Sequence, residues 1–139
     1  MIRVCTACGA TNRIPPRHLA SNGRCGTCKE ALPAQSSPID VPDIATFDTI
    51  IQSSPWPVLV DFWAAWCGPC RMAAPEVAKA AEAMAGKALV LKVDTEALPA
   101  LSQRYSIQGI PNFIVFRAGE VAFQQAGLVK ADTMMSWLS

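Results

Sequence analysis

Apolar residues form two continuous runs that flank a stretch of helical character. Residues 58–64 are apolar apart from Asp61, and residues 88–93, apolar apart from Lys92, form the second run. Both runs have the pattern of strands that are buried on both faces of a sheet. The Ala-rich residues 69–84 between them predict a helix, which Pro75 should kink. A strand, a helix and a strand in this order predict two parallel strands joined by a right-handed crossover.

Weaker patterns extend this unit in both directions. Phe47, Ile50 and Ile51 follow helical spacing after Pro42 and Asp43, which are typical of a helix start. Towards the C-terminus we expect a short helix at 98–105, strands at 113–116 and 121–123 joined by a hairpin turn, and a closing helix at 132–138. The predicted fold class is therefore α/β, with a mixed central sheet flanked by helices.

The first 33 residues differ from the rest in charge and in apolar content. They carry five basic residues and one acidic residue, a net charge of +4, whereas residues 34–139 carry seven basic and ten acidic residues, a net −3. Residues 34–38, which contain Pro and Ser, have the composition of a linker. We predict a small domain at 1–33, a linker at 34–38 and a larger domain at 39–139. The small domain has too few apolar residues for a core, so it needs a metal, a disulfide or a partner to fold.

The overall composition excludes several classes of protein. The chain has 139 residues, of which 51% are hydrophobic and 17% charged, which predicts a packed protein rather than a disordered one. A net charge of +1 argues against binding of a polyanion by the whole chain. No apolar stretch reaches the roughly 18 residues of a membrane helix. The first residues lack the apolar segment of a secretory signal. We therefore expect a cytoplasmic protein with no membrane partner.

All six cysteines occur in CxxC pairs, and one pair follows the first predicted strand. Cys67 would lie at the N-terminus of the next helix, where amide groups and the helix dipole stabilise a thiolate. Pro69 suits the first helical turn because it has no N–H group to leave unpaired. Cys70 lies one turn further on the same face, within reach of Cys67. Such a pair can close into a disulfide and reopen; the alternatives are an inert pair or half of a metal site.

The stretch around this pair resembles the thioredoxin family. Residues 60–70, with the sequence VDFWAAWCGPC, are similar to the family's active-site stretch, and residues 109–111 resemble its cis-proline loop. The resemblance covers about residues 38–139 and implies the thioredoxin fold and thiol–disulfide exchange. It implies that Cys67 attacks a client disulfide, that Cys70 resolves the mixed disulfide, and that Pro111 is cis. The residues that it implies for client binding are Trp66, Gly68, Pro69, Ile110 and Gly127.

Residues near the pair have both a functional and a structural interpretation. A buried carboxylate at Asp61 should have a raised pKa, because desolvation disfavours its charged form. The resemblance places Asp61 behind the two sulfurs, accepting a proton from Cys70 through water; the alternative is an Asp that faces solvent. We assign Trp63 to the core and Trp66 to the shielding of the sulfurs and to client contact. Lys92 lies near Asp61 by resemblance, or else at an exposed strand end.

The other four cysteines predict a metal site in the small domain. Two CxxC pairs separated by sixteen residues have the spacing of a zinc ribbon, with the ligands Cys5, Cys8, Cys25 and Cys28. Four thiolates leave no open coordination position, so the zinc would be structural and would supply the folding energy of this part. Gly9 and Gly26 are expected to form the tight turns beside the sulfurs. The alternatives are two structural disulfides or a metal-free redox reserve.

The first cysteine pair and residues 12–15, with the sequence NRIP, resemble the zinc-carrying bacterial thioredoxins of the thioredoxin 2 type. This resemblance implies a protein-disulfide reductase that is itself reduced by thioredoxin reductase with NADPH. It also implies client proteins that contain disulfides. We expect one structural zinc, no tightly bound organic cofactor, and a monomer. Oxidation of the four cysteines with release of zinc is a further hypothesis.

Three other functions compete with this interpretation. A basic ribbon could bind nucleic acid, but four thiolates and one Zn²⁺ would lower its charge from +4 to about +2. Residues 1–33 also contain no aromatic side chain for base stacking. A disulfide isomerase or oxidant is the second alternative, although the Gly68-Pro69 pair is, by resemblance, that of the reductants. The third is a redox-independent chaperone that uses the ribbon surface.

Overall fold

A five-stranded sheet forms the centre of the larger part of the molecule. The computed structural model describes residues 1–139. The strand order is β5-β7-β6-β8-β9, with the bounds β5 (Ile39–Asp40), β6 (Val58–Trp63), β7 (Leu89–Asp94), β8 (Asn112–Arg117) and β9 (Glu120–Ala126). Strands β5 and β6 run parallel to β7, β8 runs antiparallel to β6, and β9 runs antiparallel to β8. The sheet is therefore mixed, as the sequence predicts, and its parallel pair β6–β7 is the predicted one.

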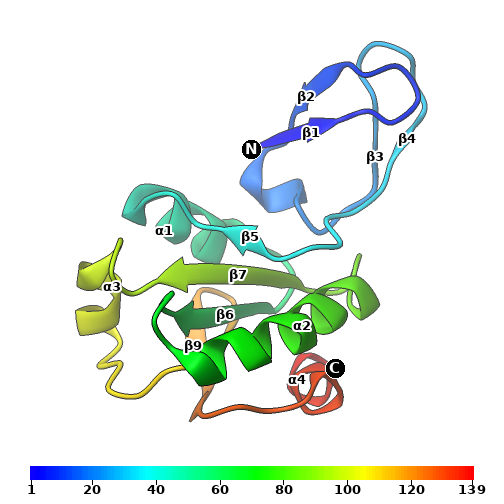
Figure 1. Cartoon of the computed structure of the whole chain (residues 1–139). Coiled ribbons are helices and arrows are strands. Elements are labelled where there is room, and N and C mark those ends of the chain that lie inside the picture. The colour runs from blue at the N-terminus through cyan, green and yellow to red at the C-terminus, as the bar shows by residue number, and fades with distance from the viewer.

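Helices cover both faces of this sheet (Figure 1). Their bounds are α1 (Ile44–Ser53), α2 (Gly68–Ala83), α3 (Pro99–Arg104) and α4 (Ala131–Leu138). Buried residues of α1 and α3 pack with one face, and those of α2 and α4 pack with the other. Helix α2 continues through Pro75. The two apolar clusters are the two halves of a three-layer core, which accounts for the apolar runs in β6 and β7.

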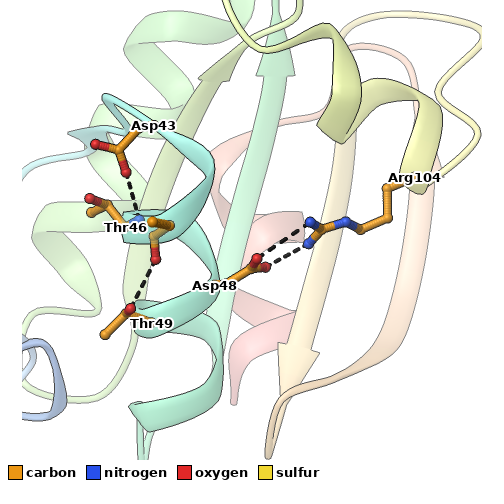
Figure 2. Close-up of polar contacts among 6 residues, drawn as sticks. Asp43, Thr46, Asp48, Thr49 and Arg104 are labelled. Carbon is orange, nitrogen blue, oxygen red and sulfur yellow. Dashed lines mark hydrogen bonds and ion pairs between the residues drawn. The ribbon is translucent and has the colours of Figure 1, made fainter.

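Polar contacts fix the start of α1 and its neighbour α3 (Figure 2). The Oδ1 atom of Asp43 accepts a hydrogen bond from the Thr46 backbone N–H at 2.7 Å, which confirms Asp43 as the start of α1. Arg104, the last residue of α3, donates to both carboxylate oxygens of Asp48 on α1, at 2.5 and 3.3 Å. This two-pronged ion pair joins two helices that lie on the same face of the sheet.

The N-terminal part consists of two small hairpins and one 3₁₀ turn. Their bounds are β1 (Ile2–Val4), β2 (Thr11–Arg13), η1 (Pro16–His18), β3 (Gly23–Arg24) and β4 (Ala31–Leu32). Strand β1 pairs with β2 and β3 pairs with β4, both in antiparallel fashion. One CxxC pair lies in the loop of each hairpin. The two loops approach each other at the end of the hairpins that is far from the sheet (Figure 1).

The segment between the hairpins packs on the larger part of the molecule. Leu19 and Ala20 are each 2% exposed and belong to the same apolar cluster as Phe47 of α1. The Gln35 backbone N–H donates to the Leu19 carbonyl at 3.1 Å, so the predicted linker begins with a fixed contact. The hairpins are thus attached to the α1 side of the sheet through buried apolar residues (Figure 1).

No helix in the structure combines the length and the apolar character that a crossing of a membrane requires.

Candidate functional site

The junction between β6 and α2 carries the Cys67–Cys70 pair. Cys67 is the residue that caps α2; its backbone is extended, with φ −84° and ψ 112°. Its sulfur accepts a hydrogen bond from the Cys70 backbone N–H at 3.2 Å. Pro69 lies in the first turn, where no N–H group is lost. The positive end of the helix dipole therefore meets the Cys67 sulfur, as the sequence predicts.

The two sulfurs are joined in a disulfide, with the Cα atoms 5.2 Å apart. Cys67 and Cys70 are only 4% and 5% exposed, and they pack with Ala64, Trp63 and Ile110. This environment is apolar, yet Cys67 lies at its edge, where α2 begins. A cysteine pair at this position can undergo thiol–disulfide exchange with the sulfur of another molecule that approaches from the surface.

The loop before β8 faces this pair. The Ile110–Pro111 peptide bond is cis, as the family resemblance implies. The Ile110 carbonyl oxygen lies 3.7 Å from the Cys67 sulfur. Gly127, at φ +100°, donates its N–H to the Pro111 carbonyl oxygen at 2.8 Å. Segments far apart in the sequence therefore meet beside Cys67.

Trp66 projects from the same junction and is 66% exposed. Its indole N–H donates to the Glu96 carboxylate at 2.8 Å. A hollow of about 200 Å³ lies beside it and is lined by Trp66, Thr95, Ser102, Ile107, Gln108 and Ile110. The contact of Trp66 with Glu96 was not predicted, because thirty residues separate the two and no local pattern signals it.

Asp61 lies in the middle of β6 with 1% of its surface exposed. It is opposite Lys92 on β7 and Phe113 on β8, and its Oδ1 atom has no hydrogen-bond partner. Burial raises the pKa of this carboxyl from 3.8 to about 7, and the charge of Lys92 offsets only part of that effect. A solvent-facing Asp61 is therefore wrong. Leu59, two residues earlier on the same face, packs with α2 residues, so Asp61 also faces α2.

Trp63 and Lys92 contact each other near Asp61. The Lys92 ammonium lies 4.8 Å from the centre of the Trp63 ring, a cation–π distance. Trp63 is half-buried and packs against the cysteine cluster, in line with its assignment to the core. Lys92 is half-buried as well, and it lies opposite Asp61 in the β6–β7 register, so it is near the carboxyl as the resemblance implies.

The four remaining cysteines lie together at the ends of the two hairpins. Their sulfur atoms are all within 4.8 Å of one another, and they belong to Cys5, Cys8, Cys25 and Cys28. The Cys5–Cys28 and Cys8–Cys25 sulfur pairs are 3.6 and 3.7 Å apart. Zn–S bonds of about 2.3 Å in a tetrahedron separate sulfurs by about 3.8 Å, so the four thiols fit a zinc ion. His18 is exposed and lies outside the cluster.

The two cysteine loops have the same backbone pattern. In the first loop the Cys5 N–H donates to the Ala10 carbonyl, and the Gly9 N–H donates to the Cys5 carbonyl. In the second loop the Cys25 N–H donates to the Glu30 carbonyl, and the Lys29 N–H donates to the Cys25 carbonyl. Gly9 has φ +75°, and in the second loop Lys29 takes the equivalent conformation with φ +66°. Gly26 lies in the turn directly after Cys25, as expected, but the left-handed position of this loop is taken by Lys29.

Hydrogen bonds from both hairpins lower the pKa of the Cys25 thiol. The Cys28 backbone N–H and then the Asn12 carboxamide stabilise its charged form, and together with the other groups they lower the pKa of Cys25 to about 6. Asn12 was a part of the sequence resemblance but was not predicted as a site residue. Its contacts with Cys25 and Gly26 are with the other hairpin, so no local signal points to them.

Comparisons with known proteins cover both parts of the chain. A family model described as "Thioredoxin" matches residues 38–139, and one described as "Thioredoxin 2, N-terminal", a zinc ribbon, matches residues 4–30. Thioredoxin C-3 of Corynebacterium nephridii is 37% identical over 138 residues, which span 99% of this chain and 93% of that protein. Thioredoxin 1 of a Nostoc species is 42% identical over 94 residues, 68% of this chain and 88% of that one.

Solved structures agree with these sequences. A mutant thioredoxin from Halobacterium salinarum superimposes with a TM-score of 0.69 and 32% identity, over 75% of this chain and 89% of that one. Plasmodium falciparum thioredoxin gives a TM-score of 0.66 and 27% identity, over 72% and 95% of the two chains. The strand-to-helix cysteine pair lies in the segment that the first family model matches. The chain therefore belongs to the thioredoxin family, with an N-terminal zinc ribbon of the thioredoxin 2 kind, and it is a thiol–disulfide oxidoreductase.

Proposed function

We propose that this oxidoreductase is a protein-disulfide reductase in which Cys67 is the nucleophile and Cys70 the resolving thiol. The observation that carries the proposal is the position of the Cys67 sulfur, which caps α2 and accepts the Cys70 N–H at 3.2 Å. An N–H donor and the positive end of a helix dipole favour a thiolate over a thiol. The thiolate is the species that attacks a disulfide.

The reaction passes two electrons from the dithiol to the client. The Cys67 thiolate attacks one sulfur of the client disulfide, so that a Cys67–client bond forms and the other client sulfur leaves as a thiolate. Cys70 then loses its proton and attacks the Cys67 sulfur. This step forms the Cys67–Cys70 disulfide, breaks the mixed disulfide and releases the second client thiolate. The oxidised product of this sequence is the disulfide form described above.

Asp61 is the proposed acceptor of the Cys70 proton. A carboxyl with a pKa of about 7 is partly ionised at neutral pH, so it can take a proton in one step and return it in the next. Its unpaired Oδ1 atom faces α2, the helix that carries Cys70. Its burial also keeps the proton out of direct exchange with bulk water.

The client is proposed to bind along the loop that faces Cys67. The Ile110 backbone, beside the cis Pro111, would pair with an extended client segment as a short added strand. Gly68 and Pro69 leave the approach to Cys67 open, because neither carries a long side chain. Trp66 and the turn at Gly127 would form the borders of this surface.

The partners follow from this chemistry. Reduction of the Cys67–Cys70 disulfide is assigned to thioredoxin reductase with NADPH, and the clients are proteins with accessible disulfides. A reducing cytoplasm suits a dithiol that must return to its reduced form. The proposed working unit is a monomer, with no membrane or nucleic-acid partner and no tightly bound organic cofactor. Residues 1–33 offer no aromatic side chain on which a base could stack.

One structural Zn²⁺ is proposed for the ribbon, held by Cys5, Cys8, Cys25 and Cys28. The ion would draw the two hairpins together and supply the folding energy that the small apolar cluster there cannot. All four positions of its tetrahedron are then filled by sulfur, so it takes no direct part in the reaction. Loss of the ion on oxidation of the four thiolates is part of the same proposal.

The test is trapping of the mixed disulfide during insulin reduction with NADPH and thioredoxin reductase. In the Cys70→Ser variant the resolving step is absent, so about one client molecule per chain should remain bound in a form that dithiothreitol releases. The matched control, Cys67→Ser, should form no adduct and reduce no insulin. Turnover of the Cys70→Ser variant at the wild-type rate would show that the roles are assigned wrongly. Zinc content per chain, measured on the same preparation, tests the ribbon separately.

A further inference from the structure

The Asn12 side chain connects the two cysteine loops, although Asn12 is not one of the proposed metal ligands. It lies in β2 of the first hairpin and is half-buried. Its Nδ2 group donates to the Ala10 carbonyl oxygen of its own hairpin at 3.3 Å and to the Cys25 sulfur of the other at 3.5 Å. Its Oδ1 atom accepts the Gly26 N–H at 2.9 Å. One carboxamide therefore holds both sides of the cysteine cluster.

The orientation of this carboxamide follows from its neighbours. The Gly26 N–H needs an acceptor, so the oxygen of Asn12 must face Gly26 and the nitrogen must face Cys25. Cys25 is completely buried, and the backbone donors to its sulfur, such as the Thr27 N–H at 3.4 Å, come from its own loop. A Cys25 thiolate at this position has no access to water, so a further donor from the first hairpin matters for the stability of its charge.

The chemistry of a four-thiolate site makes such donors important. Four thiolates and one Zn²⁺ carry a net charge of −2. N–H groups that point at the sulfurs spread this charge, and side chains that orient the ligands typically change metal affinity by about 10–100-fold when they are removed. Asn12 does both, because it donates to one sulfur and fixes the loop that carries it.

We propose that Asn12 is a positioning residue for the metal site: it holds the second cysteine loop against the first hairpin and supplies a hydrogen bond that stabilises the buried Cys25 thiolate. The proposal rests on the zinc site put forward above and adds a residue to it. The ions that suit this site are those that take four thiolates in a tetrahedron, namely Zn²⁺ and its spectroscopic substitute Co²⁺.

Two substitutions separate the parts of this role. Asn12→Asp keeps an oxygen for the Gly26 N–H, but in place of the group that donates to Cys25 and Ala10 it has a second carboxylate oxygen. Asn12→Ala removes all three hydrogen bonds, those with Ala10, Cys25 and Gly26. Asn22→Ala is the matched control: Asn22 also lies in the ribbon, and its Oδ1 atom accepts the Ala34 N–H at 2.9 Å, but it contacts no sulfur.

The experiment uses the full-length chain and measures Zn²⁺ affinity by competition with a chromophoric chelator. We expect Asn12→Asp and Asn12→Ala to bind Zn²⁺ about 10–100-fold more weakly than the wild type, and Asn22→Ala to bind it like the wild type. With saturating Co²⁺, the sulfur-to-metal charge-transfer band should shift in both Asn12 variants. Loss of fold stability alone would not move that band, because it reports on the coordinated sulfurs.

Three results would overturn the proposal. An Asn12→Asp variant with wild-type affinity for Zn²⁺ would show that the hydrogen bond to Cys25 does not contribute to metal binding. An equal loss of affinity in Asn22→Ala would show that any weakening of the ribbon suffices. A wild-type chain that binds neither Zn²⁺ nor Co²⁺ would refute the metal site itself, a failure distinct from the first two.

Discussion

Asp61 shows how a single buried residue can be costly to the fold and still suit the reaction proposed for it. Its pKa of about 7, against 3.8 for an exposed carboxyl, means that folding favours the protonated form. The stability that this protonation contributes is complete below about pH 4 and is lost as the pH rises through 7. A shift of this size corresponds to about 4 kcal/mol.

The Asp61→Asn variant should lose this dependence on pH. In urea unfolding of the oxidised proteins, we expect similar stability at about pH 4 and a gain of about 4 kcal/mol for the variant at about pH 8, because only the wild type loses the stability that protonation contributes. The resolving step should become slower in the variant at neutral pH. If the two proteins show the same difference in stability at every pH, Asp61 does not titrate in the way proposed.

At this scale the sequence predicts residues whose environment is set locally. Asp61 is surrounded by apolar neighbours along one strand, and Cys67 lies between a strand and a helix, so both environments follow from the pattern. Glu96, Asn12 and Lys29 do not follow from it. Glu96 and Asn12 act on residues that are distant in the sequence, and Lys29 adopts a left-handed conformation for which Gly is the usual choice.

Helix α2 shows how an element depends on the size of its buried residues. Ala80 is completely buried between this helix and the sheet, whereas Ala78 is exposed on the same helix. Ala80→Leu should destabilise the protein by about 1–3 kcal/mol, because a larger side chain pushes α2 away from the sheet. Ala78→Leu is the control and should change stability by less than about 0.5 kcal/mol. Equal urea midpoints for the two variants would contradict the close packing described here.

Elements with a clear apolar pattern could be predicted, including the short helices α3 and α4, whereas strands of two or three residues could not. The two buried strands and α2 appear close to their predicted bounds. Strand β9 extends to Ala126, beyond the predicted 121–123, because it is exposed and its Gln residues interrupt the apolar pattern. Strands β1–β5 have only two or three residues each, too few for a period to appear. The strands β1–β4 depend on hairpin pairing beside the cysteine cluster, and β5 depends on pairing with β7.

The ribbon contributes buried residues to the core of the larger part of the molecule. Leu19 is buried in the cluster that contains Phe47, and Ile14 packs against both this cluster and the one around Cys5 and Cys25. Sequence analysis leaves the relative placement of the two parts open, because their contact rests on a few apolar residues outside any periodic pattern. A continuous chain of packed side chains therefore runs from the proposed metal site to α1.

Removal of the metal should consequently weaken the larger part as well. All four tryptophans lie outside the ribbon, at positions 56, 63, 66 and 137, so their fluorescence reports on the larger part alone. We expect a strong chelator to lower the urea midpoint that this fluorescence records.

The Leu19→Ala variant tests whether the contact between the two parts carries this effect. It should by itself lower the free energy of unfolding by about 2–5 kcal/mol, and it should also reduce the further effect of the chelator, because the contact that couples the two parts is already weakened. Val4→Ala, at an exposed ribbon position, is the control and should leave the effect of the chelator unchanged. A chelator effect of equal size in the wild type and in Leu19→Ala would mean that the metal acts on the larger part by another route, and no effect in either would mean that the two parts unfold independently.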